Sequence, residues 1–226
     1  MKIALCQINP TVGAINQNKN SIFDWYHRAI DLGADLVVFP ELSLIGYPPQ
    51  DLLLRNRFIE NAKYALDEIA QKSTIPIILG NTMMEDNKLY NCAFFCEKGE
   101  IISHYKKRLL PTYDVFDEAR YFTSGSESCV VKISINGENV YLGLQICEDL
   151  WDHNYDCKVS SIQKELGAEI LINISASPYH KERLRKRRSI IGDKVKELNI
   201  PFFYCNMVGA QDELIFDGQS IGVSDN

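Results

Sequence analysis

The chain has 226 residues, of which 46% are hydrophobic and 24% are charged, and its formal net charge is -6. These values lie near the averages for globular proteins and exclude a disordered, collagenous or fibrous chain. The acidic balance gives no reason to expect a nucleic acid or an anionic membrane as a partner. Since the apolar stretches are short and the first residues have no signal-peptide layout, we expect a cytoplasmic protein that does not span a membrane.

Strands and helices alternate in the first part of the chain. Apolar residues at helical spacing, such as Ile15 and Ile22, predict a helix that Gly33 ends, and a second helix is expected over residues 58–71. Lys-Gly-Glu at residues 98–100 predicts a hairpin loop. Strands are expected around these features, over residues 2–8, 35–39, 75–79, 90–97 and 101–105.

The alternation continues to the end of the chain. Asn136 and Gly137 form the strongest short hairpin signal in the sequence. A helix over residues 178–198 is expected to begin with Ser177 as its N-cap and Pro178 as its first residue. The remaining predicted elements are strands over residues 129–135, 140–146, 169–174 and 202–205, a helix over residues 159–166, and a terminal hairpin over residues 213–216 and 220–223.

Strands linked by helices, together with central hairpins, predict an α+β fold with a mixed sheet covered by helices. The sequence shows neither an internal repeat nor a linker-like stretch, so one domain over residues 1–226 is expected. The terminal hairpin is not followed by a closing element, which indicates a chain truncated from a longer parent.

Seven cysteines are scattered along the chain, and most of them lie in apolar, strand-like runs. Their odd number and wide spacing are typical of buried free thiols in a reducing compartment. The sequence contains no Cys-x-x-Cys pair and only four histidines, so we expect no metal site.

Three segments each place a reactive side chain just after an apolar strand, namely Glu41, Lys107 and Cys147. Taken singly, each has a structural explanation: a surface glutamate, a charged strand edge closed by a proline, and a core cysteine. Together they meet the needs of thiol catalysis. A thiol requires a base that accepts its proton, and a tetrahedral intermediate requires a positive donor beside its oxygen. Glu41 and Lys107 supply these two groups if the strand ends converge.

The same segments carry a resemblance to a known family. Phe-Pro-Glu-Leu at residues 39–42, Lys-Arg-Leu-Leu-Pro at 107–111 and Cys-Glu-Asp-Leu-Trp at 147–151 match, in order, the motifs of the nitrilase superfamily. The chain resembles more closely the glutaminase (glutamine amidotransferase) domains of glutamine-dependent NAD synthetases. The segments that carry this closer resemblance are residues 46–53, 110–118, 147–151 and 216–218.

The resemblance implies a four-layer α-β-β-α sandwich and a catalytic triad of Glu41, Lys107 and Cys147. It implies hydrolysis of L-glutamine through a thioester on Cys147, with no cofactor for the amidase step. In that family the amidase domain precedes a synthetase domain, which is absent here and is the expected partner, in cis or in trans. ATP and Mg are expected only for that domain. A homo-oligomer is expected because members of the superfamily usually pair.

The resemblance also implies roles for residues around the triad. Glu118 matches an additional glutamate beside the lysine, and the backbone N–H of Glu148 is expected to support the oxyanion. Arg183 is expected to pair the α-carboxylate of glutamine bidentately. It belongs to a basic run over residues 181–188, which otherwise predicts a solvated helix face rather than a nucleic-acid site. The residues expected to bind substrate are Tyr47, Tyr113, Trp151, Ser177 and Arg183, together with Glu148.

Two other functions fit the sequence. A stand-alone amidase of the same superfamily would share the triad but would not need contacts from Tyr113, Ser177 and Arg183. A catalytically silent domain would bind a partner or a small amide, with Cys147 merely buried. Ammonia release from glutamine, asparagine and simple amides tests the first alternative, and the reaction of Cys147 with a thiol-directed electrophile tests the second.

Overall fold

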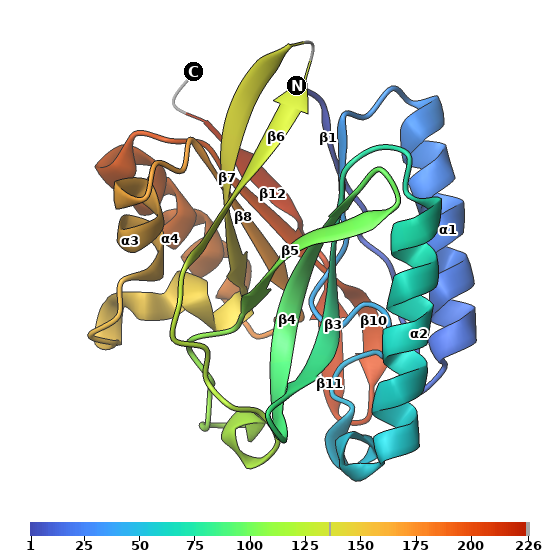
Figure 1. Cartoon of the computed structure of the whole chain (residues 1–226). Coiled ribbons are helices and arrows are strands. Elements are labelled where there is room, and N and C mark those ends of the chain that lie inside the picture. Colours follow the sequence, from blue (N-terminus) through green and yellow to red (C-terminus); the bar gives the residue numbers. More distant parts are fainter. Residues whose placement is uncertain (136, 225–226) are drawn as a thin grey trace.

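The computed structural model describes residues 1–135 and 137–224. The first half of the chain forms a mixed sheet in the order β1-β2-β3-β4-β5, in which β1, β2 and β3 are parallel and β4 and β5 are antiparallel additions. Two long helices cover its outer face (Figure 1). The elements are β1 (Ile3–Leu5), α1 (Ile15–Asp31), β2 (Leu36–Val38), the 3-10 helix η1 (Gln50–Leu54), α2 (Asn56–Lys72), β3 (Ile77–Glu85), β4 (Lys88–Glu97) and β5 (Glu100–Lys106).

The second half forms another mixed sheet, in the order β12-β9-β8-β7-β6. Its three central strands are parallel and its two edge strands are antiparallel to their neighbours. A short ribbon of β10 and β11 lies outside both sheets. The elements are η2 (Glu118–Arg120), β6 (Cys129–Ile135), β7 (Glu138–Ile146), η3 (Cys147–Asn154), α3 (Val159–Glu165), β8 (Ile170–Ser175), α4 (Arg183–Leu198), β9 (Phe202–Asn206), β10 (Val208–Gln211), β11 (Leu214–Asp217) and β12 (Ile221–Val223).

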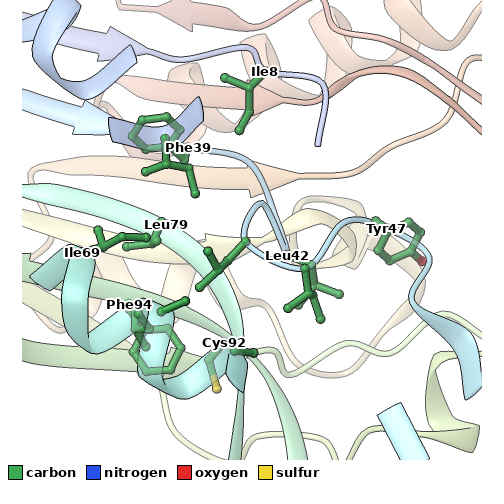
Figure 2. Packing of buried hydrophobic residues seen from close by; sticks show 14 of the residues in the cluster. Ile8, Phe39, Leu42, Tyr47, Ile69, Leu79, Cys92 and Phe94 are labelled. Atoms are coloured by element: carbon green, nitrogen blue, oxygen red, sulfur yellow. The ribbon is translucent and has the colours of Figure 1, made fainter. Parts of the chain in front are cut away.

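Three apolar clusters separate four layers of structure. Because successive strand residues point to opposite faces of a sheet, Val37 lies in the cluster under α1 and α2, and Val38 lies in the cluster between the two sheets. Leu171 and Ile172 divide in the same way between the cluster under α4 and the central one. Figure 2 shows the first of these clusters, and Figure 1 shows the helices on the two outer sides. The predicted four-layer α-β-β-α sandwich is confirmed.

The predicted helices and hairpins agree with the structure in most places. The buried face of α1 includes Ile15 and Ile22, as the helical spacing requires. Lys98 and Gly99 both have positive φ, which is typical of a two-residue hairpin turn between β4 and β5. Strands β6 and β7 pair as predicted, although Asn136 itself lies outside the described residues.

The prediction of a helix that begins at Pro178 is wrong, because α4 begins at Arg183. The backbone before α4 is bound to other elements of the fold. The Ser177 N–H donates to Asn206 Oδ1 at 2.9 Å, and the Tyr179 N–H donates to the Ile215 carbonyl at 2.6 Å. Ser177 is therefore part of a loop held by tertiary contacts, not an N-cap.

The predicted terminal hairpin is also wrong. Strand β11 pairs with β10, whereas β12 pairs with β9 and forms an edge of the second sheet. The turn at Asp217 and Gly218 thus passes from the ribbon into the sheet. The Val-Gly-Ala-Gln sequence of β10 has no alternating apolar pattern, so sequence alone offers no partner for β11 except the strand that follows it.

Candidate active site

Glu41 lies in the loop that leaves β2, and its side chain is fully buried. Phe39 and Leu42, on either side of it, pack into the first cluster and anchor the loop (Figure 2). The loop crosses β3 at Gly80, where a Cβ atom would lie 2.2 Å from the Leu42 nitrogen. This close approach of two backbones requires glycine at residue 80.

Three donors fix the Glu41 carboxylate. Its Oε1 accepts hydrogen bonds from Lys107 Nζ at 2.7 Å and from Asn91 Nδ2 at 2.8 Å. Its Oε2 accepts the backbone N–H of Ala176 at 2.9 Å. Asn91 belongs to β4 of the first sheet, whereas Ala176 follows β8 of the second. The carboxylate therefore lies where the two sheets meet.

Lys107 directly follows β5, and its side chain is fully buried. Its ammonium contacts Glu41 Oε1 at 2.7 Å and Glu118 Oε1 at 2.8 Å. Burial by itself lowers the pKa of Lys107, but Glu118 and Glu41 reverse this effect and hold the pKa well above its ordinary value. Lys107 is therefore a permanent positive charge at neutral pH.

Glu118 is the first residue of η2 and is 5% exposed. Besides Lys107, Tyr47 donates its hydroxyl to Glu118 Oε1 at 2.9 Å. Burial raises the pKa of Glu118 to about 7, and the hydrogen bond and charge of Lys107 offset only part of this rise. Glu118 thus changes its charge near neutral pH.

Cys147 stands at the junction of β7 and η3, with a φ of 42°. Residues other than glycine seldom adopt this left-handed conformation, which here lies where β7 ends and η3 begins. The residue is 5% exposed. Burial and, next, the Glu41 carboxylate raise the pKa of the Cys147 thiol well above its ordinary value, whereas Lys107 lowers it. The resting thiol is therefore protonated, and Glu41 is the charge with the largest influence on it.

Four of the predicted substrate residues form two contacting pairs, and one member of each pair, Glu148 or Trp151, lies in the η3 turn that Cys147 begins. Glu148 accepts hydrogen bonds from the hydroxyl of Tyr113 at 2.8 Å and from that of Tyr155 at 2.9 Å. The guanidinium of Arg183 lies 5.0 Å from the centroid of the Trp151 ring, a cation–π contact. Burial raises the pKa of Glu148, while the two tyrosines, Lys107 and Arg183 lower it. The Glu148 carboxylate is thus within the electrostatic influence of Arg183.

Ser177 is buried and is bound by Arg187, a residue of the basic run for which the sequence predicted exposure to solvent. Arg187 is fully buried; its Nη2 donates to the Ser177 carbonyl at 2.9 Å and its Nη1 pairs with Asp217 at 2.9 Å. The predicted solvated face of α4 is therefore wrong at this position. Arg187 lies four residues before the buried Ile191, so helical spacing turns both toward the second sheet.

The structure brings Glu41, Lys107 and Cys147 into one site, as the convergence of strand ends predicts, and Glu118 lies beside Lys107, as the resemblance implies. Tyr47 contacts Glu118 in this site, whereas Tyr113 is 43% exposed and lies at its rim. The residues that sequence reasoning missed are Asn91, Asp149, Tyr155 and Arg187. A sequence signal existed only for Asn91, a lone amide within the apolar strand Tyr-Asn-Cys-Ala-Phe-Phe.

Two cavities border these residues. One has a volume of about 280 Å³, and its lining includes Tyr47 and Glu118. The other has a volume of about 410 Å³, and its lining includes Arg183 and Tyr179. Within residues 1–135 and 137–224, His, Cys, Asp and Glu side chains do not gather in a group suited to a metal ion. None of the helices in this part of the chain combines the length and apolarity that a bilayer span requires.

The fold and the site define a hydrolase of the carbon–nitrogen type, and the chain belongs to the carbon-nitrogen hydrolase family, which it matches over residues 2–225. It is 41% identical over 227 residues to a glutamine-dependent NAD(+) synthetase of Thermotoga maritima and 40% identical over 240 residues to one of Synechocystis sp.. These matches cover 99% and 98% of this chain, but 38% and 42% of the relatives. The chain thus spans about two fifths of the length of the curated relatives it matches.

One solved structure gives the same assignment, and a second has the same fold. The glutamine-dependent NAD+ synthetase of Acinetobacter baumannii superimposes with a TM-score of 0.91 at 32% identity, over 98% of this chain and 41% of that one. An amidase from Nesterenkonia sp. superimposes with a TM-score of 0.85 at 24% identity, over 99% of this chain and 82% of that one. The second likeness concerns the fold.

Proposed function

We propose that this chain hydrolyses the side-chain amide of L-glutamine to glutamate and ammonia, with Cys147 as the nucleophile. The observation that carries the proposal is the buried ammonium of Lys107 held between Glu41 and Glu118, beside a thiol whose pKa responds to all three charges. A base and a cation at one cysteine are what acyl transfer to a thiol requires. The names of the relatives support glutamine as the substrate.

The proposed reaction has two halves. Glu41 accepts the Cys147 proton as the sulfur attacks the amide carbon, and Lys107 and the Glu148 N–H stabilise the oxyanion that forms. Glu41 then gives the proton to the nitrogen as the C–N bond breaks, so that ammonia leaves and a γ-glutamyl thioester remains. Water, deprotonated by Glu41, attacks the thioester, and glutamate leaves as Cys147 regains its proton.

The substrate is proposed to lie against the rim residues. Arg183 pairs the α-carboxylate of glutamine, because a guanidinium matches a carboxylate with two parallel hydrogen bonds. Stacking on Trp151 holds this guanidinium in place. Tyr47, Tyr113 and Ser177 complete the proposed contacts.

The fate of the ammonia is a further part of the proposal. The relatives are named glutamine-dependent NAD synthetases and are longer than this chain. We propose that the ammonia serves the ATP-dependent and Mg-dependent amidation of deamido-NAD to NAD by a synthetase domain, in cis or in trans. Pairing of this chain with a second copy remains a prediction.

Ammonia release tests the proposal. Cys147→Ala is expected to reduce glutamine hydrolysis to the background rate, because the variant has no atom to form the thioester. Cys157→Ala removes a partly exposed thiol that has no part in the proposed reaction and is the matched control, with unchanged activity expected. Glutamine turnover by Cys147→Ala at the wild-type rate would refute the mechanism. Simple amides cleaved as efficiently as glutamine would instead indicate a stand-alone amidase.

A further inference from the structure

The Asp149 carboxylate is fully buried two residues after Cys147, and the reaction described above gives it no part. Its Oδ1 accepts the backbone N–H of Leu109 at 3.0 Å. Its Oδ2 accepts the backbone N–H of Ile146 and the hydroxyl of Tyr105, both at 2.9 Å. Leu109 lies two residues after Lys107, and Ile146 directly precedes Cys147. One carboxylate thus joins the segments that carry the cation and the thiol.

Strand pairing does not by itself set the distance between these segments. Lys107 follows β5, at the edge of the first sheet, whereas Cys147 follows β7, within the second sheet. Side chains packed between the sheets determine how the two strand ends lie relative to each other. Asp149 adds directional hydrogen bonds to this apolar packing, and hydrogen bonds to a charged acceptor are about twice as strong as neutral ones.

We propose that Asp149 is a positioning residue that sets the placement of Lys107 relative to Cys147 and thereby the stabilisation of the oxyanion. This inference rests on the proposed function, in which Lys107 must meet the oxygen of an amide under attack by Cys147. Loss of an oxyanion donor or its displacement by about 1 Å lowers turnover by about 10²-fold or more.

Both side-chain oxygens of Asp149 must accept a hydrogen bond from a backbone N–H group. The N–H groups of Leu109 and Ile146 are backbone donors that cannot turn away. Burial raises the pKa of Asp149 to about 6, and bonds from Ile146, Leu109 and Tyr105 offset part of this rise. Asp149 is therefore ionised at neutral pH. Asparagine has the same shape, but its NH₂ group would face one of the two backbone donors.

The test compares kcat for glutamine hydrolysis in Asp149→Asn with that in the wild type. Each kcat is divided by the fraction of molecules whose Cys147 reacts with iodoacetamide. Peptide mass spectrometry identifies the alkylated cysteines. Alkylation of Cys205, which is fully buried in the folded protein, measures the unfolded fraction, and this fraction is subtracted. The expected result is a fall of about 10²-fold in kcat for each reactive site, with KM for glutamine within about threefold of the wild type. A purely structural role would lower the number of reactive sites and leave kcat for each site unchanged.

Two controls separate positioning from general stability. Tyr105→Phe removes one hydrogen bond from Asp149 but leaves both backbone bonds in place. Asp152→Asn breaks the ion pair with Lys194 at 2.7 Å in the same turn and leaves the Lys107 loop untouched. Both variants are expected to keep kcat for each reactive site within about threefold of the wild type. An equal loss in Asp152→Asn would overturn the proposal.

The remaining outcomes are also decisive. A value of kcat for each reactive site of Asp149→Asn near that of the wild type overturns the proposal. If the variant is unfolded, trimethylamine N-oxide is added to favour the folded state. Recovery of fold without recovery of kcat supports the proposal, whereas recovery of both, or of neither, makes the role structural.

Failure of the proposed function would be recognised separately. If the wild type hydrolyses no glutamine, the rate constant of Cys147 alkylation replaces kcat as the readout, because this reaction needs no amide substrate. A fall of at least about threefold in Asp149→Asn alone would then support the positioning role. An unchanged alkylation rate would overturn it.

Discussion

Gly80→Ala tests whether the position of Glu41 depends on the contact between two backbones. The added Cβ atom would lie 2.2 Å from the Leu42 nitrogen and 2.7 Å from both the Cα and the carbonyl carbon of Glu41. Ordinary contact begins at 3.4 Å, so the segments must separate by about 1 Å. The neighbouring atoms are backbone, and they cannot rotate away as the end of a side chain can.

The expected cost has two parts. Overpacking of this kind destabilises a fold by about 1–3 kcal/mol. Displacement of Glu41 by about 1 Å from its contact with Lys107 is expected to lower kcat by about 10²-fold. Urea unfolding measures the first effect, and ammonia release from glutamine measures the second.

Gly192→Ala provides the matched control, because a Cβ atom at this position in α4 meets nothing within 4 Å. In a helix this change is expected to stabilise the protein by about 0.5–1 kcal/mol and to leave kcat unchanged. If Gly80→Ala kept both the stability and the turnover of the wild type, the reasoning about Glu41 would be refuted.

Two further predictions concern buried charges. Because the pKa of Glu118 rises from 4.5 in the unfolded chain to about 7 in the folded one, the folded state binds this proton more tightly, and wild-type stability falls as pH rises through that window. Glu118→Gln removes this dependence. In urea titrations the unfolding free energy of the variant, minus that of the wild type, should therefore increase by up to about 3 kcal/mol between about pH 4.5 and pH 8. The same pH dependence in both proteins would contradict this prediction. Arg187→Met leaves Asp217 without its partner at 2.9 Å and is expected to cost about 3–5 kcal/mol in the same assay. Arg188→Met, at an exposed neighbour, should cost less than about 0.5 kcal/mol, and equal losses would disprove the assignment.

Local pattern was sufficient for most of the fold. The helical spacing of Ile15 and Ile22 predicted α1, and the Asn-Gly hairpin signal between two apolar runs predicted β6 and β7. Both depend on interactions between residues near in sequence. The start of α4 and the pairing of β11 were predicted wrongly, because bonds from Asn206 and from β10 decide them.

The candidate site also contains residues that local pattern indicated and residues that it did not. The order and spacing of Glu41, Lys107 and Cys147 indicated the family, since each follows an apolar strand within a recognisable motif. The basic run in α4 indicated solvent exposure, yet Arg187 is buried. Its partner Asp217 is 30 residues away, and a local pattern carries no information on such a contact.

The sequence by itself indicated the candidate residues for the chemistry and most of the strands and helices that carry them, because reactive groups and hydrophobic periodicity are properties of short segments. Only the tertiary structure decided that Asn91 and the Ala176 N–H hold Glu41, and that Asp149 joins the Lys107 loop to the Cys147 turn. Each of these contacts joins segments far apart in the chain that meet only after the two sheets have packed. Buried polar groups must find partners wherever that packing brings them, so their identity is a property of the assembled fold.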